Sequence, residues 1–560
     1  MKIPVFPRRI FEATRQLVDE NFTFIIFMVC CNLPVLTTYD NVGTVITQFV
    51  YIFVVNVLVA LLLCAIPRGK ARKTAQAVVI AVSLLLFFLY TYFEIFYHGV
   101  PDQSVLEIIL ETTPSEASGY VMAYLMNAWY VVAFVSVLAV AYLILRHAGK
   151  LRSKRGVVSA VSAMVLAGAF MALGNIVVEK LNRDMSTYRR VRYEGCSVIG
   201  MTLLMVKAVS NMHAMSKMEG GLRHKPVILR NDSSIPYVVY ILGESVTRHH
   251  LGLYGYHLNT TPLLSARERQ GNFIKFTDVI SPDPVTRKSL GKMFTFHRRG
   301  MKGEWYESTD LFSILRQAGY HTAWLSNQEY SGKHVNTARL YASRCDTCAY
   351  TLYRIMGNHT IADPYDEALF PLLDNVLARP RRKNFIVLHM MGAHQLYSAR
   401  YPQSRRKFTA AQEYGATARI RAEKADYDNA VLYNDSVIDA VIRRFEDKDA
   451  IVVYTPDHGE DVMEENVRMP GHYEMNPNRQ MVEIPMIVWV SDKFREKRPG
   501  LVERIRRSAA RPFVTDDMIH TLLDLMQIST KEYCGRFSVI NDRYDSGRIR
   551  YCGDRRYRRN

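Results

Sequence analysis

The sequence has 560 residues, of which 49% are hydrophobic, and a formal net charge of +18 at pH 7. This length suffices for two or more domains, and the absence of a repeat with a period of about 20 to 50 residues excludes a repeat array. The basic excess suits a polyanionic partner, which is either a nucleic acid or an anionic membrane surface.

The first third of the chain contains five apolar segments without charged residues. Each is near or above the roughly 20 residues that cross a bilayer as a helix. The segment with Pro34 fits least well, but no small-residue cleavage site follows it, as a signal peptide would require. We therefore expect a transmembrane domain of five helices over residues 1–180, with spans at residues 21–39, 43–67, 74–93, 117–145 and 156–178.

The basic residues of this region set its orientation. Lys and Arg precede the first span and occupy the second and fourth loops, whereas the loops at residues 40–42 and 94–116 contain neither. The positive-inside rule then puts the N-terminus in the cytoplasm and everything after residue 180 outside, in the periplasm. There a basic surface faces anionic lipid or lipopolysaccharide rather than nucleic acid. The Arg-rich C-terminal end is equally well explained as a solvated tail.

Residues 181–235 have a mixed composition that is typical of a linker. Its Arg-rich and Met-rich stretches predict amphipathic helices on the membrane surface, and helical packing against the next domain is the alternative.

From residue 236 to 560, strand and helix patterns alternate. This alternation predicts an α/β domain with a mostly parallel sheet and helices on both faces. The predicted strands are residues 236–242, 321–326, 385–389, 451–456 and 484–490, and the predicted helices are residues 309–319, 363–378 and 427–445.

Three of these strands end in side chains that bind metals. Glu244 follows the first, His389 ends another and His394 comes shortly after it, and Asp457 and His458 follow a fourth. Because the carboxyl ends of parallel strands meet at one edge of a sheet, we expect these residues to lie close together. Carboxylates and imidazoles are ligands for zinc or manganese, so the pattern predicts a metal site. His389 itself is expected to be structural.

A candidate nucleophile precedes the helix pattern of Leu290, Met293 and Phe294. Prolines 282 and 284 hold the approach extended, so that Thr286 falls at the N-cap of this helix. A helix N-terminus offers free N–H groups that suit a phosphate. Alternatively, Thr286 serves only as a cap.

Five cysteines lie outside the predicted spans, where an oxidising compartment favours disulfides. We predict a Cys345–Cys348 bridge and a Cys534–Cys552 bridge. Half a zinc site or a redox motif is the alternative for the first pair.

Taken together, the five spans, the Gly243-Glu244-Ser245 motif, the helix opened by Thr286 and the Asp457-His458-Gly459-Glu460 motif resemble a known family. They are similar to the phosphoethanolamine transferases of Gram-negative bacteria, which are membrane members of the alkaline phosphatase superfamily. The segment Leu110 to Ser118 looks most like the branch that modifies the heptose of the lipopolysaccharide core.

This resemblance implies a zinc ion bound by Glu244, Thr286, Asp457 and His458, with a second zinc left open. It implies that Thr286 attacks phosphatidylethanolamine and forms a phosphoethanolamine–threonine intermediate. The acceptor is then lipopolysaccharide, at a core heptose or a lipid A phosphate, and the protein is expected to be a monomer. The added amine offsets surface charge, which implies resistance to cationic peptides such as polymyxin.

The resemblance also implies residues that contact substrates. His394 and His472 match substrate-binding histidines that can hold a second zinc, and Lys333 resembles a lysine that contacts the donor phosphate, although a solvated loop lysine is an equal alternative. Thr112 and Glu116 match a donor-binding set, while Ile108 stands where that set usually has Asn. Glu116 also completes a helix capping box with Thr113.

Other functions fit less well. A phosphoglycerol transferase shares the same core and membrane plan. A sulfatase or phosphodiesterase would not need a five-span anchor, and the Cys-x-Pro-x-Arg pattern of sulfatases is absent near Thr286. A transporter would be expected to carry charges inside its spans, and these spans have none.

Overall fold

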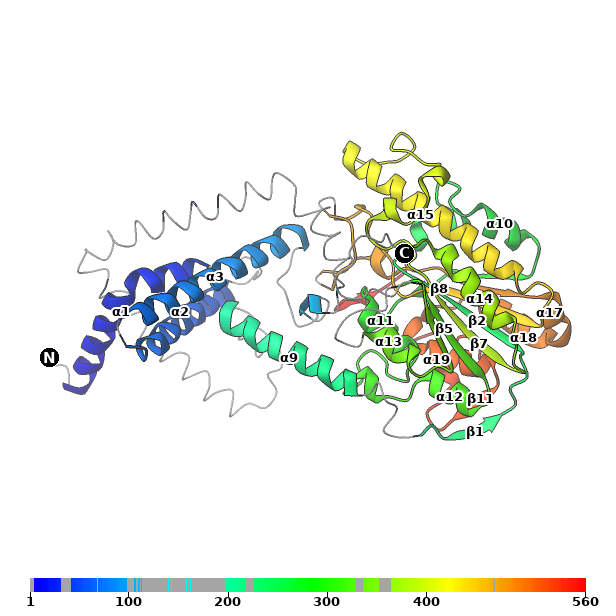
Figure 1. Ribbon diagram of the computed structural model, residues 1–560, viewed down its shortest axis with the longest axis horizontal. Coiled ribbons are helices and arrows are strands. Elements are labelled where there is room, and N and C mark those ends of the chain that lie inside the picture. The colour runs from blue at the N-terminus through cyan, green and yellow to red at the C-terminus, as the bar shows by residue number, and fades with distance from the viewer. Residues whose placement is uncertain are drawn as a thin grey trace. The chain divides into compact units, whose positions relative to one another are not determined.

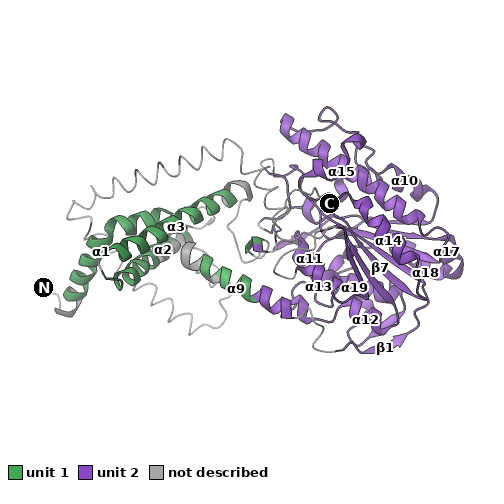
Figure 2. Cartoon of the chain, in the orientation of Figure 1, with its two compact units in different colours: residues 1–109, 121–210 green, residues 110–120, 211–560 purple. Residues whose placement is uncertain are grey.

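A computed structural model of the chain describes residues 5–31, 42–67, 69–97, 197–217, 225–328, 336–351, 364–466, 469–474 and 476–559, with some single positions between 105 and 162. The chain divides into two compact units (Figure 2). Residues 1–109 and 121–210 form the first unit, and residues 110–120 and 211–560 form the second.

Three helices of the first unit overlap the first three predicted spans, the first of them only over residues 21–31: α1 (Val5–Cys31), α2 (Val42–Cys64) and α3 (Lys70–Tyr97). They share a buried cluster that includes Phe22, Ile25 and Ile52. Among the described residues, the segment Lys70–Phe93 is the one long and apolar enough to cross a membrane. Helix α1 carries charges over its first half and ends before Pro34, and most of the fourth and fifth predicted spans lies outside the described residues. Five spans are therefore not confirmed.

Helix α9 (Ser197–Lys217) occupies the predicted linker. Near its C-terminal end, Met215 is fully buried in the core of the second unit, so this end packs against the soluble domain, as the alternative prediction had it. Strand β1 (Ile228–Asn231) then pairs with β11 (Ile528–Thr530), and the chain joins this unit before residue 236.

The second unit is built on a seven-stranded sheet in the order β3-β9-β8-β2-β7-β5-β6. All neighbouring strands pair in parallel except that β9 is antiparallel to both β8 and β3. The sheet is therefore mixed, with a parallel centre as predicted. Its strands are β3 (Phe273–Phe276), β9 (Met486–Val490), β8 (Ala450–Pro456), β2 (Tyr237–Gly243), β7 (Asn384–His389), β5 (His321–Ser326) and β6 (Thr347–Tyr350).

Both faces of the sheet are buried, as expected of a parallel sheet. Because strand side chains alternate between faces, Val238 and Tyr240 of β2 join one apolar cluster, whereas Val239 and Ile241 join another. Figure 1 shows the two helical layers that cover these faces. On one side lie α10 (Pro262–Arg269), α14 (Leu369–Leu377) and α15 (Ala418–Arg443), and on the other α11 (Thr286–Met293), α12 (Leu311–Gln317), α13 (Thr337–Ala342) and α19 (Met518–Leu525).

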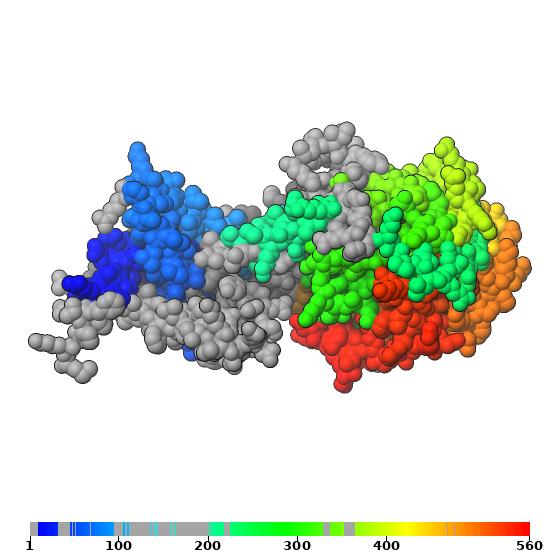
Figure 3. All heavy atoms as spheres, turned by 90° about the horizontal axis from the view of Figure 1, so that it is seen from below, coloured from blue at the N-terminus to red at the C-terminus, as the bar shows by residue number. Residues whose placement is uncertain are grey.

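The C-terminal part of the chain completes this unit with short elements. Residues coloured orange to red form part of its surface in Figure 3. These and the remaining elements are α16 (Arg479–Val482), α17 (Asp492–Lys497), α18 (Pro499–Ser508), the parallel pair β4 (Val279–Ile280) and β10 (Phe513–Val514), and the hairpin of β12 (Arg550–Cys552) and β13 (Arg555–Tyr557).

Candidate metal centre

Two central strands deliver the carboxylates of the site. Strands β2 and β8 pair in register, with Gly243 opposite Pro456, so Glu244 and Asp457 leave the sheet at the same level. The backbone N–H of Asp457 also donates to the carbonyl of Gly243, at 3.3 Å. This edge holds the carboxyl ends of the parallel strands, where open α/β sheets place their ligands.

Glu244, Asp457 and His458 form a compact, buried cluster. One ligand atom from each lies within 4.8 Å of the others. His458 Nε2 is 3.4 Å from Glu244 Oε1 and 3.3 Å from Asp457 Oδ2. The other ring nitrogen, Nδ1, donates to the carbonyl of Gly459 at 2.8 Å. This bond leaves the lone pair of Nε2 facing the two carboxylates, which is the tautomer that a metal ligand requires.

Thr286 completes the cluster. Its Oγ1 lies 3.0 Å from His458 Nε2 and 3.4 Å from Glu244 Oε1. Helix α11 begins at Thr286 and has Val285 at its N-cap, one residue before the predicted position, and no side chain caps it. The hydroxyl therefore faces the cluster, and the alternative in which it only caps the helix is wrong.

The charge of the cluster fits a divalent cation. Burial raises the pKa of Glu244 to about 8, and the negative charge of Asp457 adds to this rise. Burial likewise raises the pKa of Asp457 to about 7. Burial, followed by the neighbouring His472, lowers the pKa of His458 to about 4. Asp457 Oδ2 accepts no hydrogen bond from the described residues. Two carboxyl groups beside a neutral imidazole, with oxygen lone pairs free, are a donor set for zinc or a similar metal.

Two further side chains hold Glu244 in place. Ser245, which adopts a positive φ of 58°, donates from Oγ to Glu244 Oε1 at 2.8 Å. Gln328, two residues beyond β5, donates from Nε2 to Glu244 Oε2 at 3.3 Å and to the carbonyl of Met390 at 3.2 Å. Gln328 is not among the site residues predicted from the sequence. The signal that could have found it is its position after a predicted strand that ends at the same edge.

Gly392 allows the loop after β7 to pass close to Glu244. At its φ of +61°, a Cβ atom would lie 2.4 Å from the carbonyl oxygen of Glu244 and 2.7 Å from its nitrogen. Both are backbone atoms of a buried strand end and cannot move aside, so only glycine fits here.

Replacing Gly392 with alanine is therefore expected to displace Glu244 and to weaken metal binding. Gly255→Ala is the matched control, because Gly255 also has a positive φ, of +97°, but nothing lies within 4 Å of its added Cβ. The control should lose about 1 kcal/mol of stability from backbone strain alone. Thermal unfolding and metal titration of both variants check this, and equal metal affinities would contradict the assigned role of Gly392.

A second group of ligating side chains lies beside the first. His458, Glu460 and His472 also offer atoms within 4.8 Å of one another. Glu460 is fully buried, accepts from the Tyr397 hydroxyl at 2.6 Å and lies 2.6 Å from His472 Nδ1. The rings of His458 and His472 are 4.1 Å apart between centroids.

His394 lies next to this second group, with its ring centroid 6.1 Å from that of His472. Burial, and then the charge of Arg400, lowers the pKa of His394, and its Nδ1 finds no hydrogen-bond partner among the described residues. The structure thus brings the two predicted substrate-binding histidines together. His389 is buried and shares a hydrogen bond of 3.1 Å with Ser326, which agrees with a structural role.

The roles of the other residues that the resemblance implies stay predictions. Lys333, Glu116 and Ile108 lie outside the described residues. Thr112 is half-buried in the segment 110–120 of the second unit, and its role stays a prediction.

The structure contains neither predicted disulfide, since Cys345, Cys348, Cys534 and Cys552 are all free. Cys345 packs against the core, whereas Cys348 is exposed. Cys552 is buried against the carbonyls of Pro477 and Asn478. The thiols of Cys345 and Cys348 therefore lie in different surroundings, and the thiol of Cys552 contacts backbone carbonyls.

A family model described as Sulfatase matches residues 236–528, which is about half of the chain. The chain belongs to the Sulfatase family. The matched region contains every residue of the cluster, including Thr286. Membership sets the fold and the position of the site, and the acceptor and chemistry vary between members of a fold.

Curated relatives carry more specific names. Phosphoethanolamine transferase EptC of Escherichia coli O18:K1:H7 is 31% identical over 314 residues, which cover 55% of this chain and 53% of that protein. Kdo(2)-lipid A phosphoethanolamine 7''-transferase of E. coli K12 is 31% identical over 267 residues, which cover 46% of this chain and 45% of that protein. The chain thus spans about half the length of these relatives.

Solved structures agree with this family. The zinc complex of the C-terminal periplasmic domain of E. coli EptC matches with a TM-score of 0.55 and 28% identity, covering 59% of this chain and 93% of that one. The integral membrane protein EptA of Neisseria meningitidis matches with a TM-score of 0.62 and 24% identity, covering 95% of this chain and 98% of that one, and supports the fold alone. The predicted resemblance to phosphoethanolamine transferases of the alkaline phosphatase superfamily is confirmed.

Proposed function

We propose that this Sulfatase-family protein is a zinc-dependent transferase that moves phosphoethanolamine from phosphatidylethanolamine to lipopolysaccharide. The observation that carries the proposal is the Thr286 hydroxyl, which lies within 3.4 Å of both Glu244 and His458 at the first residue of a helix. The names of the relatives and the zinc in the EptC domain support the group transferred and the metal. The acceptor is a core heptose or a lipid A phosphate.

Glu244, Asp457 and His458 would hold the zinc together with Thr286. The ion would lower the pKa of the threonine hydroxyl, which is a poor nucleophile at neutral pH, and would neutralise phosphate charge. The N-terminal turn of α11 directs backbone N–H groups to the same place, where they can bind the phosphate oxygens of the donor.

Two transfer steps follow. Thr286 Oγ1 loses its proton and attacks phosphorus, the phosphorus–oxygen bond to diacylglycerol breaks, and the departing oxygen takes up the proton that the threonine has lost. The acceptor oxygen then loses its proton and attacks the phosphorus of the phosphoethanolamine group on Thr286. The bond from phosphorus to Thr286 Oγ1 breaks, and the threonine hydroxyl regains a proton. A nucleophile that carries the group between two acceptors divides one difficult step into two easier ones.

His472 is suited to move these protons. With Nδ1 held by Glu460 at 2.6 Å, its Nε2 is left for the departing or incoming oxygen. Burial lowers the pKa of His472 to about 4, so the ring is neutral and can accept a proton.

Replacing Glu460 with glutamine should weaken the orientation of His472 and lower turnover by about 10- to 100-fold, without loss of metal. The pH profile of turnover should shift, whereas Tyr397→Phe, which removes only the second hydrogen bond to Glu460, should have a smaller effect. An unchanged profile in Glu460→Gln would exclude this role.

The proposed location is the bacterial inner membrane, with several spans and the catalytic domain in the periplasm. Helix α3 and the likeness to the periplasmic domain of E. coli EptC support it. We further propose that the protein acts as a monomer and that the modified surface resists polymyxin.

The transfer itself is tested with lipopolysaccharide and vesicles that contain phosphatidylethanolamine and phosphatidylglycerol, each labelled in its headgroup. We expect the ethanolamine label to appear on lipopolysaccharide. Transfer of the glycerol label would establish a phosphoglycerol transferase instead, and release of soluble phosphoethanolamine without modified acceptor would establish a hydrolase.

A further inference from the structure

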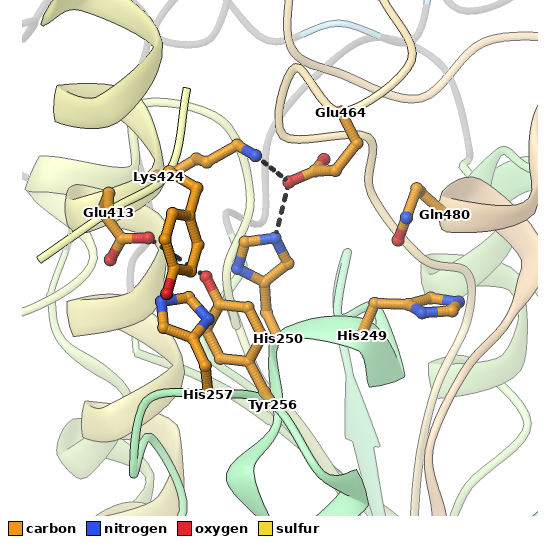
Figure 4. Close-up of a pocket in the computed structure, with 9 residues that line it drawn as sticks. His249, His250, Tyr256, His257, Glu413, Lys424, Glu464 and Gln480 are labelled. Carbon is orange, nitrogen blue, oxygen red and sulfur yellow. Dashed lines mark hydrogen bonds and ion pairs between the residues drawn. The ribbon is translucent and has the colours of Figure 1, made fainter. Parts of the chain in front are cut away.

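A cavity of about 220 Å³ in the second unit is lined by residues that do not belong to the metal cluster. Figure 4 shows these residues. The cavity has room for roughly seven water molecules at about 30 Å³ each. Figure 4 shows His250, Tyr256 and His257 on one wall, Glu413 and Lys424 on another, and Glu464 above them. Glu464 belongs to the same loop as Glu460, four residues further along the chain.

The charged groups around the cavity balance only while one of the three carboxyl groups holds a proton. Lys424 Nζ pairs with Glu464 Oε1 at 2.9 Å. His250 lies between two carboxylates, with Nδ1 2.5 Å from Asp428 Oδ1 and Nε2 2.9 Å from Glu464 Oε1. His250 and Lys424 are thus the counter-ions of Asp428 and Glu464. The third carboxyl group, Glu413, has no cation within ion-pair distance among the described residues.

Glu413 is nevertheless buried, with 5% of its surface exposed. Its Oε2 accepts a hydrogen bond from the Tyr256 hydroxyl at 3.1 Å. Its Oε1 is buried, and burial, together with a hydrogen bond between the carboxyl groups of Glu413 and Asp428, raises the pKa of Glu413. Once Glu413 ionises it has no counter-ion among the described residues, so a positively charged donor would stabilise the ionised form.

Aromatic rings stand beside this carboxyl group. Ring centroids are 4.3 Å apart for Tyr256 and His257, and 4.6 Å apart for His257 and Tyr414. Tyr414 follows Glu413 in the chain and is 71% exposed. Aromatic rings next to a carboxylate are the surroundings that bind organic ammonium ions. A primary ammonium fits better than a quaternary one, because only the former can donate to the Glu413 carboxyl group.

We propose that this cavity binds a small primary ammonium group, with Glu413 as its counter-ion and Tyr256 and Tyr414 as its aromatic walls. The site is distinct from the metal cluster, and the proposal does not depend on which group that cluster transfers. An aminoalcohol headgroup and an amino sugar both carry the required group.

Binding should be linked to proton release. Burial, and then the neighbouring Asp428, raises the pKa of Glu413 to about 8, so it is largely protonated in the empty cavity at neutral pH. Burial alone would lower the pKa of His250, but Asp428 and Glu464 raise it to about 10, so His250 keeps its charge. Lys424 and Tyr256 are the other polar groups that line the cavity near Glu413. The affinity of the cavity for an ammonium group should therefore increase from pH 6 to pH 8, as Glu413 ionises.

The test is binding to the full-length protein, measured by saturation-transfer NMR or calorimetry. Ethanolamine and glucosamine are the probes, and the neutral ethylene glycol and glucose are their controls. We expect one or both amines to bind, both neutral analogues to bind at least tenfold more weakly, and Glu413→Gln to lose at least tenfold in affinity. Which amine binds identifies the source of the ammonium group.

Two further variants keep the test decisive. Tyr414→Ala changes an exposed ring and should weaken binding several-fold even if Glu413→Gln fails to fold. Thr286→Ala should bind the amine like wild type, which separates this cavity from the metal cluster. Equal binding of the neutral analogues, or no effect of either cavity variant, would overturn the proposal and leave the proposed transfer untouched.

Discussion

Replacing Thr286 with alanine is expected to lower the proposed transfer to lipopolysaccharide by about 10⁴-fold or more, because the proposed nucleophile is lost. The fold should persist, since the Thr286 hydroxyl caps no helix and is only partly buried. Metal affinity should fall far less than activity, because Glu244, Asp457 and His458 remain. The measurement is turnover of labelled phosphatidylethanolamine beside metal content of the same sample.

Thr286→Ser is the matched variant, because it keeps a hydroxyl at the same atom position. It should retain measurable transfer and should carry the same intermediate. If alanine and serine variants were equally active, the hydroxyl would have no chemical role, and the nucleophile would have to be sought elsewhere.

Asp457→Asn is expected to lower metal affinity by about 100-fold or more, because it removes one of the two carboxylates of the cluster. The metal-free variant should not be less stable than metal-free wild type. In the wild type, the raised pKa values of Glu244 and Asp457 reflect the cost of burying two adjacent charges, and the amide removes one of them.

The same pair predicts the pH dependence of stability. Between about pH 4 and pH 8 the folded, metal-free protein holds protons on Glu244 and Asp457 that the unfolded chain has released. Stability of the metal-free protein therefore falls as the pH rises through this window, whereas metal affinity rises, since the ligands must be deprotonated.

Thermal unfolding of chelated wild type and Asp457→Asn across this window checks the account. The stability of Asp457→Asn should decline less steeply with rising pH than that of wild type. Asp374→Asn, which changes an exposed carboxyl group on α14, should show the same decline as wild type. A metal-free wild type that becomes more stable towards pH 8 would contradict the assigned charges of the cluster.

Much of this site follows from local sequence. The apolar runs before Glu244 and Asp457 are long enough to predict buried strands, and parallel pairing then brings both carboxylates to one edge. Strand β5 begins and ends where the pattern predicts. The pairing of particular strands, and hence the distance of 3.0 Å between Thr286 and His458, depends on contacts far apart in the chain, which local pattern cannot supply.

The misses have physical causes. Strands β3 and β6 have four residues each and lack a long apolar run. Helix α15 begins at Ala418, whereas the predicted helix begins at residue 427. The first turns were missed because they are polar and partly solvated and show no apolar periodicity. The predicted disulfides rested on compartment and spacing, which do not fix the directions of the thiols.

The most direct test of the central claim is the mass of the Thr286-containing peptide after zinc-loaded protein has been incubated with phosphatidylethanolamine in the absence of acceptor. The account predicts a phosphoethanolamine adduct on Thr286 that is absent from Thr286→Ala and disappears when lipopolysaccharide is added. An unmodified peptide, together with lipid turnover that persists in Thr286→Ala, would contradict a threonine-bound intermediate.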